Sequence, residues 1–227
     1  MRLKRLAKAS LLFAALGAVL TSSAFAAAVT EDVKWYVGSG SGTVLTGTAT
    51  AKAEQLSPES TFATTVSGMA VELHSTKVEC EACTIENSGG TAVGAGKLKF
   101  TGVTVAKPSG CSVASTLTTK SLKVKADYMI GTTNYILFEP SAGAETGLFT
   151  AELTGEKCAL KTAIVPKGTV FLQAANATGT QAVEQEVCSS EAINTEAGGT
   201  LHVGTEAATL GLGVKFTLST GEQFGTH

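Results

Sequence analysis

Apolar and polar side chains alternate at every second position along most of this chain, and this pattern constrains the fold more than any other feature. In residues 122–130, Leu, Val, Ala, Tyr and Ile alternate with Lys and Asp. In residues 210–218, Leu, Val and Phe alternate with Gly, Lys and Thr, and residues 97–101 repeat the pattern on a smaller scale. A period of two places alternate side chains on opposite faces of a strand, so each segment predicts a strand with one face in a core and one in water.

Turn-forming sequences separate these segments at short intervals, and they are rich in Gly, Pro, Asn and Ser. Examples are Asn87-Ser-Gly-Gly90, Lys107-Pro-Ser-Gly110 and Pro140-Ser-Ala-Gly143. No apolar stripe of helical period lasts beyond two turns after residue 28, although residues 181–190 fit a short helix as well as a strand. The chain therefore predicts an all-β fold, an antiparallel β-sandwich or a Greek-key barrel of about a dozen short strands.

Two irregularities in the alternation predict where the strands bend. Val71 begins a run of apolar residues at odd positions, residues 78–82 place them at even positions, and Cys83 and Ile85 return to odd positions. Each change of parity requires a bulge or a turn, because side chains cannot otherwise return to the same core. Residues 135–138 are apolar throughout, which predicts a strand that is buried on both faces or crosses between sheets.

The first 26 residues predict a secretory signal peptide. Four Lys and Arg side chains within the first eight residues form a basic head, residues 9–20 are apolar, and Ala24-Phe25-Ala26 is the pattern after which signal peptidase cuts. The apolar run is shorter than the roughly 20 residues of a membrane span. We therefore expect a secreted protein that is cleaved near Ala26, with a single all-β extracellular domain in residues 27–227 and no membrane span after cleavage.

The charge balance excludes one class of partner. The first 26 residues hold four of the 17 Lys and Arg side chains and none of the 19 Asp and Glu side chains, so residues 27–227 carry 13 basic and 19 acidic groups, a formal net charge of −6. No cluster of basic residues accompanies this modest negative charge. We therefore expect no nucleic-acid partner.

All five cysteines follow the predicted cleavage site: Cys80, Cys83, Cys111, Cys158 and Cys188. In a secreted protein they predict two disulfides and one unpaired thiol, and the sequence does not choose among the pairings. Cys80 and Cys83 have the spacing of a redox or zinc motif, but their flanks predict strands and no second ligand pair follows. Because residues three apart in a regular strand face opposite sides, we expect these two not to bridge each other.

Three short motifs carry a family resemblance. Residues 97–113 read Lys-Leu-Lys-Phe-Thr-Gly-Val-Thr-Val-Ala-Lys-Pro-Ser-Gly-Cys-Ser-Val, and Phe138-Glu-Pro140 and Lys167-Gly-Thr-Val170 follow. Through these motifs and the closing residues 208–225, the chain resembles a group of uncharacterised secreted β-rich proteins of soil actinobacteria. The resemblance implies an exported β fold and no known activity.

The chain departs from that group at Val103, where the similar proteins usually have a cysteine. In those proteins Cys80 and the cysteine at position 103 would oppose each other across a hairpin centred near Thr91-Ala92. That bridge cannot form here, so the resemblance implies that Cys80 or Cys83 is the unpaired cysteine.

Residues that carry chemistry are sparse. The three histidines, His74, His202 and His227, are isolated in the sequence, and an isolated histidine is more often a satisfied structural side chain than a base. Only two aspartates occur, which disfavours calcium loops and paired-carboxylate hydrolases. The pairs Glu79/Glu81 and Glu184/Glu186 are expected on solvated strand faces. We expect no catalytic residue, no metal site and no cofactor.

Three aromatic residues, Trp35, Tyr128 and Tyr135, are the candidates for stacking on a sugar ring, because flat apolar rings bind pyranose faces. Adjacent strand residues point opposite ways, so at most one of Trp35 and Tyr36 is exposed. For this pair we favour anchoring of the first strand over sugar binding.

These observations predict a non-catalytic secreted β-sandwich protein with a structural or assembly role in the cell envelope, at the cell surface or in the extracellular matrix. Its partners would be further copies or other envelope components. The alternative is an extracellular module that binds carbohydrate or another ligand, and a hydrolase with scattered residues ranks third. An assembly protein should show an exposed edge strand, or a segment around Val29–Val37 that is free to complete a neighbour's sheet.

Overall fold

The computed structural model describes residues 27–28, 33–38, 42–55, 59–130, 133–175, 185–189, 201–222 and 224–226. The predicted signal peptide lies outside these residues. They form antiparallel sheets and one short turn of 3-10 helix, so the prediction of an all-β fold of the sandwich or barrel type is confirmed. The elements are β1 (Ala27–Ala28), β2 (Trp35–Val37), β3 (Thr43–Val44), β4 (Thr48–Gln55), β5 (Ser60–Val66), β6 (Met69–Ser75), β7 (Lys77–Ser88), β8 (Thr91–Thr101), β9 (Thr104–Lys107), β10 (Thr116–Thr118), β11 (Leu122–Ile130), β12 (Thr133–Pro140), η1 (Ala144–Thr146), β13 (Ala151–Glu152), β14 (Ala163–Ile164), β15 (Val170–Ala175), β16 (Gln185–Ser189), β17 (His202–Val203), β18 (Glu206–Leu218) and β19 (Phe224–Thr226).

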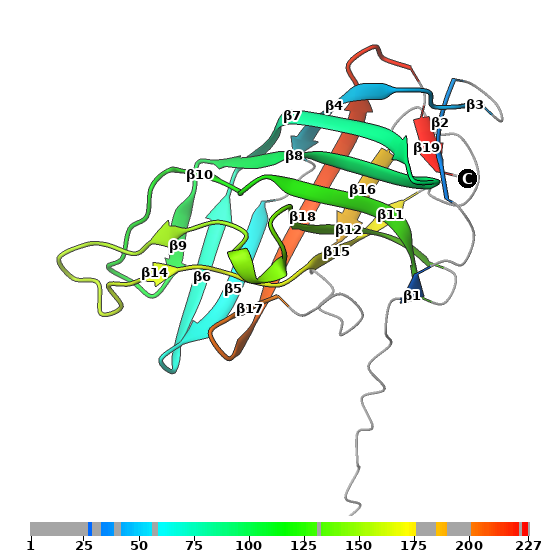
Figure 1. The fold of residues 1–227 in the computed structure, drawn as a ribbon. Helices are drawn as coiled ribbons and strands as arrows, with labels where there is room; N and C mark the ends of the chain where they lie inside the picture. The colour runs from blue at the N-terminus through cyan, green and yellow to red at the C-terminus, as the bar shows by residue number, and fades with distance from the viewer. Residues whose placement is uncertain are drawn as a thin grey trace, which may run out of the picture.

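Eight strands close into a barrel (Figure 1). Their order around the barrel is β4, β7, β8, β11, β12, β15, β16 and β18, and β18 pairs again with β4. Each barrel strand therefore pairs with the next barrel strand in the chain, and the remaining strands come before, between or after them in the sequence. A barrel of eight strands is just wide enough to be filled by side chains or to hold one small ligand.

The period-two segments form barrel strands as predicted. In β11, Leu122 is buried while Lys123 is exposed, and in β18 Leu212 and Val214 are buried. The apolar stretch Tyr135–Phe138 lies in β12, and all four of its side chains are buried. The prediction that this strand is buried on both faces is therefore confirmed.

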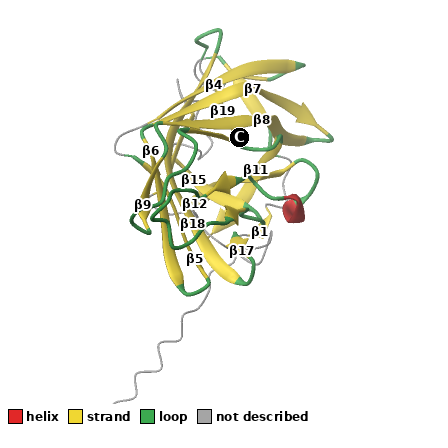
Figure 2. Ribbon diagram, turned by 90° about the vertical axis from the view of Figure 1, so that its left-hand side faces the viewer, coloured by secondary structure: helices red, strands yellow, loops and turns green. Residues whose placement is uncertain are grey.

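A second, smaller sheet grows from β18. The first half of β18, Ala208–Gly211, pairs with β5, and β6 and β9 follow in order. The second half, Val214–Leu218, pairs with β4 of the barrel. Figure 2 shows β5 and β6 running steeply across the direction of β4, β7 and β8. Phe149 joins the two sheets, because its ring centre lies 5.3 Å from that of Phe62 in β5 and 6.4 Å from that of Phe100 in β8.

Strand β19, the last strand of the described chain, pairs with β2 near the N-terminal end, and the two strands cap the barrel. Strand β2 lies between β19 and β3, beside the β7–β8 hairpin (Figure 1). Asn87 in the hairpin accepts a hydrogen bond from the Trp35 backbone N–H at 2.7 Å and donates to the Trp35 and Leu45 carbonyls, both at 3.0 Å. Because β2 already has two partners, it is not free to complete a neighbour's sheet, and the part of Val29–Val37 before Val33 lies outside the described residues.

A bulge in β7 brings Cys80 and Cys83 together. The register with β8 shifts between Glu81 and Thr84, and Ala82 has a left-handed φ of 51°. Both cysteines then face inward and form a disulfide with a Cα–Cα distance of 5.7 Å. The prediction that these two cysteines do not bridge is therefore wrong, because β7 is not regular at the position where the parity change predicts a bulge.

A second disulfide joins Cys111 and Cys158, with a Cα–Cα distance of 4.3 Å. The two pairs use four of the five cysteines, so the odd cysteine is Cys188 in β16 rather than Cys80 or Cys83. The expected geometry of the β7–β8 hairpin also needs correction. Its turn is Gly89-Gly90, and Cys80 opposes Leu98 instead of position 103.

The described residues contain no helix that is long and apolar enough to cross a membrane.

Candidate functional site

Four titratable side chains that are connected by ion pairs lie on the smaller sheet, and we call them the His74 cluster. It consists of Glu59, which directly precedes β5, Glu72 and His74 on β6, and Lys107 on β9. Glu72 and His74 share one face because they are two residues apart in a strand. Glu72 lies directly opposite Lys107, and His74 lies opposite Thr61, two residues after Glu59. Strand pairing thus brings together residues that are up to 48 positions apart.

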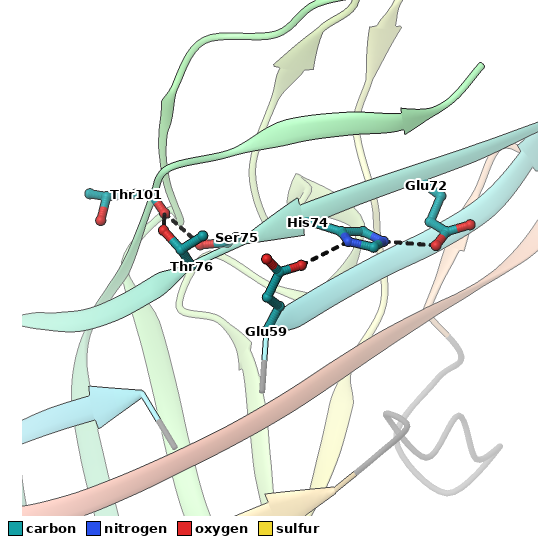
Figure 3. Close-up of polar contacts among 6 residues, drawn as sticks. All are labelled: Glu59, Glu72, His74, Ser75, Thr76 and Thr101. Atoms are coloured by element: carbon teal, nitrogen blue, oxygen red, sulfur yellow. Dashed lines mark hydrogen bonds and ion pairs between the residues drawn. The ribbon is translucent and has the colours of Figure 1, made fainter. Parts of the chain in front are cut away.

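Both ring nitrogens of His74 contact carboxylates (Figure 3). Nδ1 lies 2.9 Å from Glu59 Oε2, and Nε2 lies 2.7 Å from Glu72 Oε1. The second oxygen of Glu72 accepts from Lys107 Nζ at 2.8 Å. A neutral imidazole has one N–H donor, whereas the imidazolium has two. The geometry therefore favours a protonated His74 that donates to both carboxylates.

The charges of the His74 cluster raise the pKa of His74 and lower the pKa of Glu72. The hydrogen bond with Glu72 raises the pKa of His74 above its ordinary value of 6.5, Glu59 adds to the rise, and partial burial opposes it. The pKa of Glu72 lies below its ordinary value of 4.5, because first Lys107 and then His74 stabilise the carboxylate.

Ser75, the neighbour of His74 in the sequence, faces the other side of the sheet (Figure 3). Its hydroxyl is buried and is within hydrogen-bond distance of two carbonyls, Thr101 O at 2.9 Å and Lys77 O at 3.0 Å. Glu, His and Ser are the residue types of a hydrolase, but a triad needs a histidine nitrogen that accepts the proton of the serine hydroxyl. Both nitrogens of His74 are engaged with carboxylates. The His74 cluster therefore forms a salt-bridge network that links β6 to β9 and to the start of β5.

The ion pairs of the His74 cluster predict that the stability of the fold depends on pH. A histidine whose pKa is raised by folding stabilises the fold fully below the unfolded pKa of 6.5, and this contribution is lost as the pH rises through the folded pKa. The contribution of Glu72 has the opposite sense: it is present above 4.5 and lost as the pH falls through the lowered pKa. The His74 cluster should therefore stabilise the protein most between these two ordinary values.

The measurement is urea unfolding at about pH 5.5 and about pH 8.5. We expect the free energy of unfolding to fall at the higher pH in the wild-type chain, and this fall to be smaller in His74→Gln. The matched control is Thr104→Gln, which changes the residue opposite His74 on β9 without altering a titratable group and should retain the wild-type pH dependence. An equal fall in His74→Gln and the wild type would contradict the assignment.

Trp35 and Tyr135, two of the three predicted stacking residues, do not form an exposed binding face. Trp35 is 2% exposed and Tyr135 is 8% exposed, so neither ring offers a face to solvent. Trp35 instead anchors β2, the role that the sequence favours for the Trp35-Tyr36 pair without choosing between the two rings. The backbone of Tyr128 lies in β11, and its side chain lies outside what the structure describes. Trp35 is buried because β2 caps the barrel, and Tyr135 is buried because β12 is paired on both sides. The alternation of the sequence alone does not decide whether such rings are buried.

The predicted carboxylate pair on β7 forms ion pairs on the outer face of the barrel. Glu79 lies 2.7 Å from Lys77 Nζ, and Glu81 lies 3.6 Å from Lys99 Nζ. Glu184 and the side chain of Glu186 lie outside the described part of the chain. Within the described ranges, no three His, Cys, Asp or Glu side chains are grouped so that they would hold a metal ion.

The interior of the barrel retains an apolar cavity of about 50 Å³ below the cap. Side chains from β2, β19 and the barrel wall line it, including Trp35, Phe138, Phe216 and Phe224. A second hollow, an open depression of about 700 Å³ between β4 and β7, is lined by both Lys and Glu side chains.

The sequence missed the partners of His74. Glu72 lies two residues before His74, and this spacing was a local signal that the two share a strand face. Glu59 and Lys107 join the His74 cluster only through the pairing of β6 with β5 and β9. The chain matches no protein-family model, no curated protein and no solved structure. Its function is therefore inferred from the geometry of its own residues.

Proposed function

We propose that this chain is exported and acts as a non-catalytic structural component of the cell envelope, the cell surface or the extracellular matrix. The His74 cluster is the observation that carries the proposal. It contains the residue types of a hydrolase, yet both nitrogens of His74 are held by carboxylates and the Ser75 hydroxyl is directed at two carbonyls on the other side. Side chains with catalytic potential are thus used to fasten strands.

The two disulfides support the export half of the proposal, because disulfide bonds persist in oxidising compartments and are rare in the cytosol. The first described strand, β1, begins at Ala27, directly after the predicted cleavage site, and pairs with β11. Residues that follow the signal peptide would therefore belong to the folded domain.

The build of the barrel supports the structural half. Strand β1 pairs with β11 of the barrel, and β2 pairs with β19 in the cap. The long-range disulfide holds the loop between β13 and β14 to the loop that follows β9. Strand β9 lies at an edge of the smaller sheet, but it is short and ends at Lys107-Pro108, which are features that limit uncontrolled strand addition. We therefore place attachment on the outer face of β7 and β8, where Lys and Glu side chains alternate.

The test is to express the tagged full chain in a secreting bacterial host and to separate the medium, a salt wash of the envelope and the stripped envelope. We expect the protein without residues 1–26 in the envelope fractions, with release at high salt. The control is a chain that begins at residue 27, which should remain in the cytoplasm. Recovery as a freely diffusing monomer in the medium would contradict the structural role, and so would hydrolysis of ester or glycoside substrates that is lost in His74→Gln.

A mass measurement of the unreduced secreted protein tests the compartment independently. We expect one alkylated cysteine, Cys188, and four protected cysteines. Alkylation of all five would contradict export into an oxidising compartment.

A further inference from the structure

We propose that the apolar cavity under the cap is a binding site for a small apolar group, namely two or three carbon atoms of an alkyl chain. This binding role is separate from the structural function proposed above. The cavity has a volume of about 50 Å³ and lies between the cap and opposite walls of the barrel. Trp35 and Phe224 border it from the cap, and Ile136, Phe138 and Phe216 border it from the barrel strands. The cavity is partly open rather than enclosed.

The lining has the chemistry of an apolar site. The Trp35 and Phe224 ring centres lie 5.9 Å apart, and the indole N–H of Trp35 already donates to Val93 O at 2.9 Å. The indole therefore offers carbon surface to the cavity rather than a free donor. Apolar cavities of this kind stay dry and bind apolar molecules, because a guest restores dispersion contacts that the lining otherwise lacks.

The size of the cavity selects the guest. A cavity of about 150 Å³ holds benzene, and the cavity here has about one third of that volume. It therefore suits one xenon atom or the last two or three carbons of an alkyl chain. Larger rings would have to displace Trp35 or Phe224.

The void follows from the construction of the barrel. Eight strands set the diameter of the barrel, and side chains must fill what remains. On β8, however, Gly94 and Gly96 border the cavity. A Cβ at Gly94 would lie 2.8 Å from the backbone oxygen of Thr84, so the approach of β7 keeps this part of the wall without side chains.

The cap provides the route into the cavity. Strands β2 and β19 pair over three residues. In the order of the sequence, β2 is the first strand after β1, and β19 is the last strand. Their separation from the barrel would break the hydrogen bonds of Trp35 with Asn87 and Val93, but no pairing between barrel strands. The guest would enter beside Trp35, whose fluorescence reports on the site because it is the chain's single tryptophan.

The test uses xenon as the probe and residues 27–227 as the protein. We expect crystals under xenon pressure to show one xenon atom in contact with Trp35 and Phe138, and xenon in solution to quench Trp35 fluorescence in a saturable manner. Ala51→Val fills the cavity with two methyl groups and should weaken xenon binding at least tenfold. The matched control is Ala53→Val, which makes the same change on the same face of β4 outside the cavity and should bind xenon as the wild type does.

Absence of xenon from the cavity, or equal binding by Ala51→Val and the wild type, would overturn the proposal. If thermal unfolding shows that Ala51→Val does not fold, Val124→Ile adds one methyl group to the same cavity and should reduce binding in the same direction. Retained binding in that variant would count equally against the site. Neither result depends on where the protein resides in the cell.

Discussion

Removal of the Cys111–Cys158 disulfide is expected to lower the free energy of unfolding by about 4 kcal/mol. The two cysteines are 47 positions apart, and cross-linking so long a loop strongly restricts the unfolded chain. The two segments that the disulfide joins also pair directly beside it. Ser112 and Thr154 exchange backbone hydrogen bonds of 2.8 and 2.9 Å. Gly155 permits this approach, because a Cβ there would lie 2.7 Å from the backbone oxygen of Gly110.

The Cys80–Cys83 disulfide is the matched comparison. Its cysteines are three positions apart, so its removal should cost only about 2 kcal/mol. The measurement is urea unfolding of the two double Cys→Ala variants, each in a Cys188→Ser background that prevents exchange of disulfides. Equal losses in both variants, or a larger loss for the short loop, would contradict loop closure as the source of the stabilisation.

Trp35→Ala is expected to cost about 4 kcal/mol, the centre of the range for truncating a buried Trp to Ala. The side chain is 2% exposed, packs against Phe224 and donates from its indole N–H to Val93 O at 2.9 Å. The substitution enlarges the cavity under the cap and leaves the carbonyl of Val93 without this donor. The free energy of unfolding should be followed by far-UV circular dichroism, because the variant lacks tryptophan.

Two further substitutions separate burial from a general effect on the cap. Trp35→Phe keeps most of the apolar surface but loses the indole donor, so its cost should lie between zero and that of Trp35→Ala. Val44→Ala on β3 changes a side chain that is 42% exposed in the same cap and should shift stability by no more than about 0.5 kcal/mol. A loss below about 1 kcal/mol for Trp35→Ala would show that the cap is not coupled to the barrel.

Much of the strand content could be predicted from local patterns. The alternation in residues 122–130 and 210–218 identified β11 and the inner part of β18, because a half-buried strand requires a period of two. The apolar stretch Tyr135–Phe138 predicted a strand that is buried on both faces or crosses between sheets, and β12 shows the first of these. The change of parity before Cys83 predicted the bulge in β7, whereas the spacing of a regular strand wrongly predicted that Cys80 and Cys83 do not bridge.

The partners of these strands could not be predicted in the same way. Glu59 and Lys107 meet at His74 and Glu72 because β5 and β9 flank β6, and no local pattern specifies which strands become neighbours. The burial of Trp35 likewise depends on the pairing of β2 with β19, whose residues are separated by most of the chain.

The sequence by itself determined the all-β class, the irregularity in β7 and the double burial of β12, because each depends on side-chain spacing within a few residues. Only the tertiary structure decided the closure of the barrel through β16 and β18, the pairing of the cysteines and the ionic fastening of His74. These depend on contacts between distant segments. Such contacts form when strands are brought into register around a common core, and that register is a property of the whole chain rather than of any one segment.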